Sequence, residues 1–306
     1  MTRPIMMNFD GAVLPAGQGV LTADNRGFRY GDGLFETMLA GGGQIRLGPY
    51  HFERLLLGMR MLRFEPAAQF ASAIERQILE LCAINGHTGT GGVEGVKGGE
   101  EEGGAARSGD IGETGHSRVR LTVFRGDGSL TDTIDTFPHY IIQSSPWPAG
   151  STGWNAEGLV IDIFADGRKA CDAYATLKSN NYLLYSLAAM YGRDQGLDDC
   201  LVLNSHGRLT DSTIANLFYI KDHRFYTPPL SEGCVAGVMR RYLLEALPRA
   251  GYSVLEQPVS PEELAGADEV FLTNALRGIR WVRSFQGITY GNRLAAAVHE
   301  QIIQKM

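Results

Sequence analysis

The stretch that most limits how this chain can fold is a glycine-rich segment, residues 86–117. It holds twelve glycines and a run of three glutamates at 100–102, with hardly any large apolar residue. Such a segment cannot bury enough apolar surface to offset the conformational entropy that ordering would cost. We therefore predict a disordered insertion on a loop. A phosphate-binding loop would need a strand, a GxxxxGK[ST] motif and a helix in succession. The segment lacks this arrangement, so the sequence does not indicate such a loop.

The residues before this insertion carry the patterns of a small mixed domain. Strand and turn signals alternate through residues 5–47, and 28–33 reads as a loop punctuated by glycines. Apolar residues then recur at helical spacing in 51–62 and again in 70–84. We predict a small N-terminal α/β domain over residues 1–145.

A strand after the insertion returns the chain to this domain. In residues 118–124, Arg118 and Arg120 share one face, because side chains alternate along a strand. Two interpretations stay open. The arginines form a solvated face, or they offer guanidinium groups to a substrate carboxylate.

A proline-containing stretch separates the two halves of the chain. Pro146 and Pro148 stiffen residues 144–150, so we place a linker at 146–153. The remainder, 154–306, alternates helices with two hairpins and further strands. One predicted helix, 179–195, carries an apolar stripe that includes Leu183, Leu187, Met190 and Tyr191. Such a layout is α+β with a mixed sheet, not a regular βαβ series.

Charge and composition exclude several classes of partner. The net charge of −6, without any basic block, argues against nucleic acid. Because the N-terminus lacks an apolar segment and no 18 apolar residues run unbroken, we expect no secretion signal and no membrane span. The four cysteines are far apart and form no CxxC pair. We expect free thiols in a reducing cytoplasm and no metal site.

Two residues suggest chemistry that involves a Schiff base. Lys178 precedes a predicted helix, and Asp211 lies 33 positions later at the end of a predicted hairpin. A lysine that forms a Schiff base and an acid that holds a pyridinium would need such a scaffold. Taken singly, each has a plainer interpretation. Lys178 would be a surface lysine, Asp211 a turn or helix-cap acid, and Arg54 part of the exposed face of a helix.

Seven motif blocks, taken together and in order, resemble the class IV aminotransferase family, the fold-type-IV pyridoxal-phosphate enzymes. The resemblance covers nearly the whole chain apart from the insertion. The blocks are Tyr30-Gly31-Asp32-Gly33-Leu34-Phe35-Glu36-Thr37, His51-x-x-Arg54-Leu55, Lys178-x-x-Asn181, Asp211 to Asn216-Leu217-Phe218, Thr227-Pro228-Pro229, Gly237-Val238-Met239-Arg240 and Asp268-Glu269-Val270-Phe271-Leu272-Thr273-Asn274.

The resemblance implies a two-domain enzyme with pyridoxal 5′-phosphate as its cofactor. The larger C-terminal domain would contain a mixed, pseudo-barrel sheet. Lys178 would hold the cofactor as a Schiff base and shuttle protons, and Asp211 would pair with the pyridinium nitrogen. Most relatives carry glutamate at that position, so the chain departs from the pattern there. The other implied cofactor contacts are Arg54 and the backbone amides of Val238 and Met239 at the phosphate, together with Asn181.

The resemblance also implies substrate contacts and an assembly. The substrate contacts would be Tyr30, Thr37, Arg120, Thr273 and Asn274. Family members are homodimers in which loops of one subunit cover the site of the other. Residues 26–33 are a candidate for such a loop.

The motifs leave two reactions open. Thr37, Met239 and the segment that starts at Asn274 favour 4-amino-4-deoxychorismate lyase, which releases pyruvate and leaves 4-aminobenzoate. The spacing of Lys178 to Asn181 disfavours the branched-chain transaminases. The absence of a second arginine after strand 118–124 argues against the lyase. The alternatives are an amino-acid transaminase, of D-amino-acid or branched-chain type, and, more remotely, a non-catalytic relative that binds the cofactor.

Overall fold

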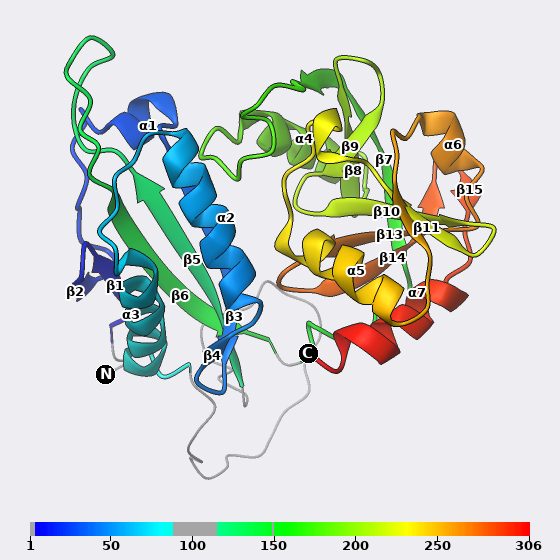
Figure 1. The fold of residues 1–306 in the computed structure, drawn as a ribbon, viewed down its shortest axis with the longest axis horizontal. Coiled ribbons are helices and arrows are strands. Elements are labelled where there is room, and N and C mark those ends of the chain that lie inside the picture. The colour runs from blue at the N-terminus through cyan, green and yellow to red at the C-terminus, as the bar shows by residue number, and fades with distance from the viewer. Residues whose placement is uncertain (1–3, 88–114, 149) are drawn as a thin grey trace.

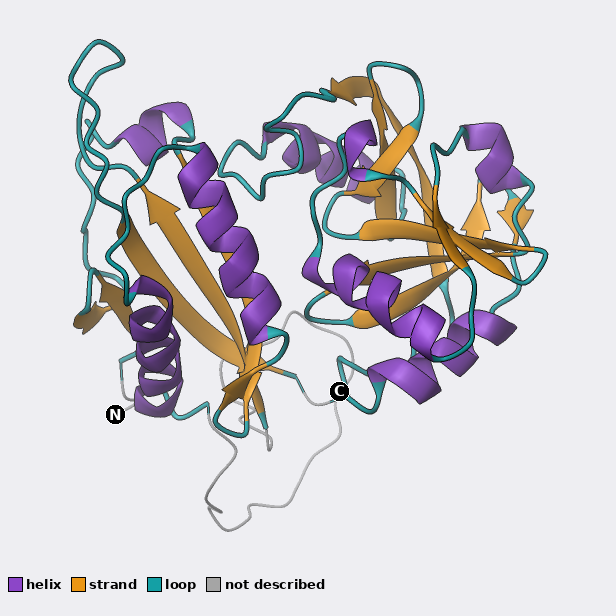
Figure 2. Cartoon of the chain, in the orientation of Figure 1, coloured by secondary structure: helices purple, strands orange, loops and turns teal. Residues whose placement is uncertain are grey.

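The computed structural model describes residues 4–87, 115–148 and 150–306. It contains two sheets, each with its own helices, and the two units lie side by side (Figures 1 and 2). Residues 88–114 of the predicted insertion lie outside the described part of the chain. Residues 116 and 117, which the prediction assigned to the insertion, belong to a strand.

The first sheet has six strands in the order β2-β1-β6-β5-β3-β4, and every described pairing in it is antiparallel. One of its faces is covered by the helices α2 (Gly48–Met61) and α3 (Phe70–Ile84), as Figure 1 shows. The strands are β1 (Met6–Phe9), β2 (Ala12–Pro15), β3 (Gly33–Gly41), β4 (Gln44–Ile45), β5 (His116–Phe124) and β6 (His139–Trp147).

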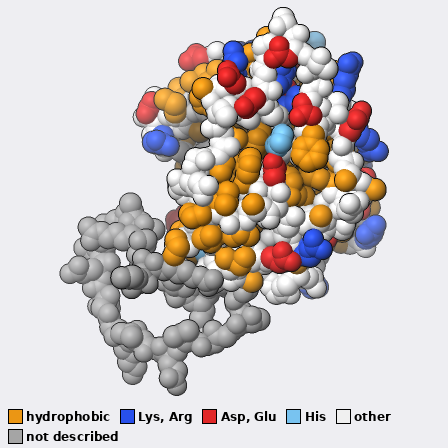
Figure 3. Space-filling view, turned by 90° about the vertical axis from the view of Figure 1, so that its left-hand side faces the viewer, with side chains coloured by type: hydrophobic (Ala, Val, Ile, Leu, Met, Phe, Trp, Pro, Cys, Tyr) orange, Lys and Arg blue, Asp and Glu red, His pale blue; other side chains and the backbone are white. Residues whose placement is uncertain are grey.

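The core of this domain lies between the helices and the sheet. Both predicted helices bury the apolar positions that recur at three- and four-residue intervals, among them Leu55 and Met59 on α2 and Ile74 and Ile78 on α3. Burying one such side chain contributes about 1.5–3 kcal/mol. Figure 3 views this domain from the side that faces away from the second domain, and hydrophobic side chains gather over the middle of that side.

The segment 28–33, predicted as a loop, contains the end of a short helix. Helix α1 (Arg26–Tyr30) begins where the Asn25 side chain accepts a hydrogen bond from the backbone of Phe28. It ends at Gly31, whose φ of 65° suits a glycine. The loop prediction was wrong because this cap pair, Asn25 and Gly31, was not recognised.

The second sheet is mixed, and six of its strands close into a ring. The order β10-β13-β14-β7-β8-β9 returns to β10 through the pairing of Asn216 with Asp211. The mixed, pseudo-barrel sheet expected from the resemblance is thereby confirmed. The strands are β7 (Leu159–Lys169), β8 (Asp199–Asn204), β9 (Leu209–Ser212), β10 (Asn216–Lys221), β11 (Arg224–Thr227), β12 (Val254–Glu256), β13 (Glu269–Asn274), β14 (Gly278–Phe285) and β15 (Ile288–Thr289).

Helices pack around this ring. Apolar side chains of α5 and α7 pack with those of β10 and β13 in one core cluster, and α4 packs on β7 and β8. The elements are α4 (Leu183–Asp194), η1 (Leu230–Glu232), α5 (Val238–Arg249), α6 (Pro261–Ala265), α7 (Arg293–Val298) and η2 (His299–Ile303).

Helix α4 differs from the prediction in its start and in its apolar stripe. It begins at Leu183, four residues later than expected. Leu183, Leu187 and Met190 are exposed, whereas Tyr191 packs on Phe164. The residues that α4 buries are Tyr185, Ala188 and Gly192, so its buried face does not coincide with the predicted stripe.

The connection between the two sheets begins later than predicted. Strand β6 continues to Trp147, so the first two residues of the expected linker, 146–153, belong to a strand. Among the residues that the structure describes, no helix has the length and apolarity that crossing a membrane requires.

Candidate active site

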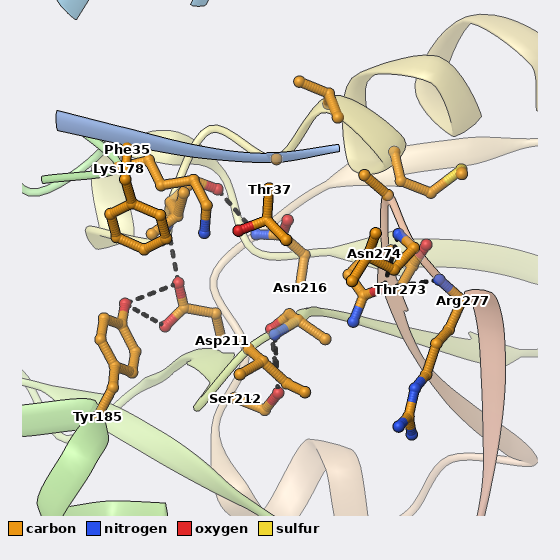
Figure 4. A pocket seen from close by; sticks show the side chains of 18 of the residues that line it. Phe35, Thr37, Lys178, Tyr185, Asp211, Ser212, Asn216, Thr273, Asn274 and Arg277 are labelled. Carbon is orange, nitrogen blue, oxygen red and sulfur yellow. Dashed lines mark hydrogen bonds between the residues drawn. The ribbon is translucent and has the colours of Figure 1, made fainter. Parts of the chain in front are cut away.

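A cavity of about 370 Å3 lies where the two domains meet. The first domain lines it from β3, α2, β5 and β6, and the second domain lines it from the loop before α4, from β9 and β10, and from the start of α5. The turn after β13 completes the wall. Figure 4 shows Lys178 and Asp211 on one side of this cavity and Arg277 on the other.

Backbone hydrogen bonds from the other domain hold the loop that carries Lys178. The Phe35 amide donates to the Lys178 carbonyl at 2.9 Å, and the Asn180 amide donates to the Gly33 carbonyl at 2.9 Å. A Cβ on Gly33 would lie 2.3 Å from the carbonyl oxygen of Val123, so this close approach requires glycine. Strand β3 of the first domain therefore fixes the position of Lys178, which belongs to the second domain.

The amine of Lys178 is in a weakly polar environment. Its Nζ lies 4.2 Å from the centre of the Phe35 ring. Burial and, after it, the charges of Arg54 and Arg120 lower the pKa of Lys178 to about 7, although the carboxylates of Glu36 and Asp211 oppose this effect. A lysine with this pKa is largely neutral just above pH 7, which is the state that attacks a carbonyl.

Asp211 lies in strand β9, with 2% of its surface exposed. It accepts hydrogen bonds from the Tyr185 hydroxyl at 3.0 Å, the Thr210 hydroxyl at 2.9 Å and the Val235 amide at 2.8 Å. The Nζ of Lys169 lies 3.2 Å from its Oδ2. These donors satisfy the buried carboxylate and hold it in one place. Asp211 is therefore not a turn or helix-cap acid.

A buried ion-pair network lies close to Lys178. Glu36 accepts two hydrogen bonds from the Arg54 guanidinium, and the Nδ1 atom of His51 lies 2.6 Å from Glu36 Oε2. Arg54 also donates to the Ala236 carbonyl at 3.0 Å. Three of its five N–H groups are thus engaged, and two remain for a further anion. The alternative in which Arg54 lies on an exposed helix face is wrong.

The start of α5 faces the same region. Gly237 is its N-cap, so the first backbone amides, those of Val238 and Met239, have no side-chain cap. A Cβ on Gly237 would lie 1.8 Å from the Asn216 side-chain oxygen, which means that only glycine fits here. Arg54 is tied to Ala236, one residue earlier, so a guanidinium and a helix N-terminus converge in an arrangement that suits a phosphate.

Three arginines line the cavity without an acidic partner among the residues that the structure describes. They are Arg118, Arg120 and Arg277. Arg120 places its guanidinium carbon 3.9 Å from the centre of the Phe35 ring. Because they pair with no acid there, all three guanidinium groups can offer hydrogen bonds to an anionic substrate.

The family model for class IV amino-transferases matches residues 33–285. The chain belongs to this family. An aminodeoxychorismate lyase from Vibrio harveyi is 28% identical over 257 residues, which cover 83% of each chain. A branched-chain-amino-acid aminotransferase from Escherichia coli is 32% identical over 199 residues, or 61% of this chain and 62% of the relative. The 4-amino-4-deoxychorismate lyase structure from Pseudomonas aeruginosa has a TM-score of 0.75 and 28% identity, covering 97% of this chain and 99% of that one.

As a class IV aminotransferase-family member, the protein is an enzyme that depends on pyridoxal 5′-phosphate. The residues of the cavity fit that cofactor. They provide one lysine amine, one buried acid, and an anion-binding corner made by Arg54 and the α5 N-terminus. Gly237 leaves room that any side chain would fill.

The cavity contains most of the residues singled out from the motifs, and two lie elsewhere. Lys178, Arg54, Asp211, Val238, Met239, Thr37, Arg120, Thr273 and Asn274 all line it. Asn181 is exposed and does not line the cavity, so its expected contact with the cofactor is not supported. Tyr30 is also outside, because its ring packs with the guanidinium groups of Arg26 and Arg29.

Three residues of the site were not recognised from the sequence. Glu36 is inside a quoted motif block, but nothing in its spacing showed that it would bind Arg54. Lys169 and Tyr185 contact Asp211 from β7 and α4. These contacts form only when β7, β8 and β9 pair side by side and α4 packs on them, so local sequence carries no signal for them.

Proposed function

We propose that Lys178 carries the cofactor and that the enzyme acts on an amino-acid-like substrate. When bound, pyridoxal phosphate supplies an electron sink for negative charge at the substrate's α-carbon. The lowered pKa of Lys178 favours covalent attachment through its neutral amine. Once the substrate amine has displaced Lys178 from the cofactor, the freed amine of Lys178 accepts the proton from the substrate's α-carbon and delivers it to another atom.

The other cofactor contacts follow from the geometry. We assign the pyridinium nitrogen to Asp211, whose charge is supported by Lys169 and Tyr185. We assign the phosphate to Arg54 and to the first amides of α5. The shorter aspartate replaces the usual glutamate, and its four donors hold its carboxylate in one place.

The proposed substrate contacts lie on two sides of the cavity, with Arg120 beside the same Phe35 ring as Lys178. Thr37 and Arg120 pair with each other across β3 and β5, and both line the cavity. Thr273 and Asn274 end β13 at the opposite wall. The rings of Phe35 and Tyr182 pack edge to face at 5.3 Å beside the Lys178 amine and limit the access of water.

The three arginines that have no acidic partner in the described part of the chain suit a substrate with two carboxylates. Aminodeoxychorismate bears two carboxylates, and Arg118, Arg120 and Arg277 offer more positive charge than one carboxylate needs. We therefore propose aminodeoxychorismate lyase activity. Loss of the α-proton together with cleavage of the bond between the ring carbon and the enol ether oxygen makes the ring aromatic and leaves 4-aminobenzoate. The expelled enolpyruvate takes up a proton on carbon and becomes pyruvate. The relatives with this name, at 28% identity, support the proposal.

An amino-acid transaminase is the second candidate. The branched-chain aminotransferase that is 32% identical over part of the chain favours it. A dicarboxylic keto acid would meet the same arginines. A transaminase differs because the proton is returned to the cofactor carbon, and the product is a keto acid.

A paired assay distinguishes the two. The purified holoenzyme is given aminodeoxychorismate, and separately an amino donor with a keto acid, while Lys178→Ala serves as the inactive control. The lyase proposal predicts equal amounts of 4-aminobenzoate and pyruvate in the first reaction. Exchange of amino groups in the second, with no 4-aminobenzoate in the first, would instead establish the transaminase.

We also propose that the enzyme is a cytoplasmic homodimer. Exposed apolar residues support an interface, namely Leu183, Leu187 and Met190 on α4 and Ile214, which lines the cavity from the loop after β9. Four unpaired cysteines, three of them buried, are consistent with a reducing compartment. Light scattering at several protein concentrations tests the dimer, and a monomer at all of them would refute it.

A further inference from the structure

A second cavity, of about 400 Å3, lies beyond the other end of β3. It is bounded by the β3–β4 hairpin, by residues 152 and 153 of the connection between the sheets, and by η2. Its described lining contains Arg46, His116 and His299 and no aspartate or glutamate. The cavity is therefore basic, and the proposed reaction makes no use of it.

His299 is the most buried polar group that lines this cavity. Only 1% of its surface is exposed, and neither ring nitrogen has a hydrogen-bond partner among the described residues. Its ring packs at 5.4 Å from that of Trp154. Buried polar groups are almost always hydrogen-bonded, and leaving one unsatisfied costs about 1–3 kcal/mol. A neutral imidazole offers one donor and one acceptor.

Two arginines stand near this histidine with much of their hydrogen-bonding capacity free. The Nε atoms of Arg46 and Arg280 are buried and have no partner in the described chain. Arg46 makes one side-chain contact, from its Nη2 to the sulfur of Met306 at 3.5 Å. Arg280 donates to the Gly153 carbonyl at 3.3 Å, on the edge of the cavity. Neither arginine forms an ion pair with a described acid.

We propose that this cavity binds a small oxyanion that also carries a hydroxyl group. The guanidinium of Arg46 supplies donors for the negative oxygens. The neutral His299 supplies one donor and also requires a donor from the ligand, which a plain carboxylate lacks. Hydrogen phosphate and the anions of hydroxy acids share this chemistry. The site does not depend on the proposed reaction.

The cavity is separated from the active site by a single turn. Residues 274–277 line the active-site cavity, and Gly278 follows them with a φ of 68°. A Cβ on Gly278 would lie 2.6 Å from the side chain of Ile303 and 3.7 Å from Arg46, both of which line the second cavity. The Thr273 hydroxyl donates to the Gly278 carbonyl at 2.8 Å. An anion that fixes Arg46 would therefore also restrain the active-site turn.

The test is calorimetric titration of the holoenzyme with inorganic phosphate and, separately, with glycolate and acetate at constant ionic strength. We expect saturable binding of phosphate or glycolate, and weaker binding of acetate, which lacks the hydroxyl. Arg46→Met and His299→Phe should each raise the Kd at least about tenfold. Two controls should leave it unchanged. Arg76→Met alters an exposed arginine, and Arg120→Gln reports any phosphate bound in the active site.

The proposal is overturned if phosphate and glycolate do not bind, or if Arg46→Met and His299→Phe bind them as the wild type does. Where either variant fails to fold, 15N spectra of the wild-type histidines replace it. The His299 resonances, assigned through their contact with Trp154, should shift saturably with phosphate. Unchanged His299 resonances at saturating phosphate would overturn the proposal equally.

Discussion

Glu36 and Arg54 form a buried two-point ion pair. The Nε atom of Arg54 donates to Glu36 Oε1 at 2.8 Å, and a second bond joins Nη2 to Oε2. Glu36 comes from β3 and Arg54 from α2, so the pair fixes the helix relative to the strand. Through Ala236 the same guanidinium reaches the segment before α5. One carboxylate therefore positions an arginine that contacts both domains.

Replacing Glu36 with glutamine should destabilise the protein and weaken cofactor binding. The amide leaves Arg54 buried without a counter-charge, and removing one partner of a buried pair costs about 3–5 kcal/mol. Urea denaturation of the cofactor-free protein measures the stability, and absorbance titration with pyridoxal phosphate measures the affinity. Glu53→Gln, on the exposed side of α2, is the matched control and should change little. Equal stability of the two variants would contradict the role given to Glu36.

Lowering the pH should remove part of the protein's stability, because it protonates the carboxyl group of Glu36. Burial opposes ionisation, but Arg54 and His51 outweigh it and lower the pKa of Glu36 from 4.5 to about 2. The folded state therefore binds the proton less tightly than the unfolded state does. The resulting stability, about 3 kcal/mol, is present above pH 4.5 and is lost as the pH falls toward 2. Across this pH range, the free energy of unfolding obtained from denaturation curves should fall more steeply for the wild type than for Glu36→Gln.

Uptake of the cofactor by Lys178 should depend on pH near neutrality. The neutral amine is the attacking species, so the uptake rate of the cofactor-free enzyme should be half-maximal at a pH of about 7. The charge of Arg120 contributes to this lowered pKa, which means that Arg120→Gln should move the midpoint upward. Stopped-flow absorbance measures the rate. A wild-type rate that still rises tenfold per pH unit above about pH 9 would show an ordinary lysine.

Gly237→Ala should impair the phosphate corner. The added Cβ would meet the Asn216 oxygen at 1.8 Å, so either Asn216 or the first turn of α5 must move. We expect pyridoxal phosphate affinity to fall about tenfold or more, as for the loss of one charge-assisted hydrogen bond. Gly266→Ala is the control, since its Cβ would meet no atom within 3.7 Å. Affinity unchanged in Gly237→Ala would show that the phosphate lies elsewhere.

How much could be predicted from the sequence depended on whether a residue's role was local. The α2 and α3 helices were predictable because their apolar spacing directly reflects the buried faces. Lys178 and Asp211 were predictable because the family motifs keep their order. Helix α1 was missed, although Asn25 and Gly31 are a recognisable cap pair. The partners of Asp211 could not be found, because Lys169 and Tyr185 reach it only once β7, β8 and β9 have paired and α4 has packed on them.

The departures were informative in physical terms. Asn181 was expected in the site from the family resemblance, but the loop pairs with β3 and leaves this side chain exposed. The α4 stripe resembled a core face, yet the helix buries Tyr185, Ala188 and Gly192 instead. In both cases tertiary pairing decided which face of a segment was buried, and sequence periodicity does not encode that choice.

The most direct test of the account is to locate the cofactor on the chain. Holoenzyme is reduced with borohydride, digested and analysed by mass spectrometry. The account predicts one phosphopyridoxyl group, on the peptide that contains Lys178, and none in Lys178→Ala. A label on Lys169, or no label on a protein that retains the cofactor's absorbance, would contradict it.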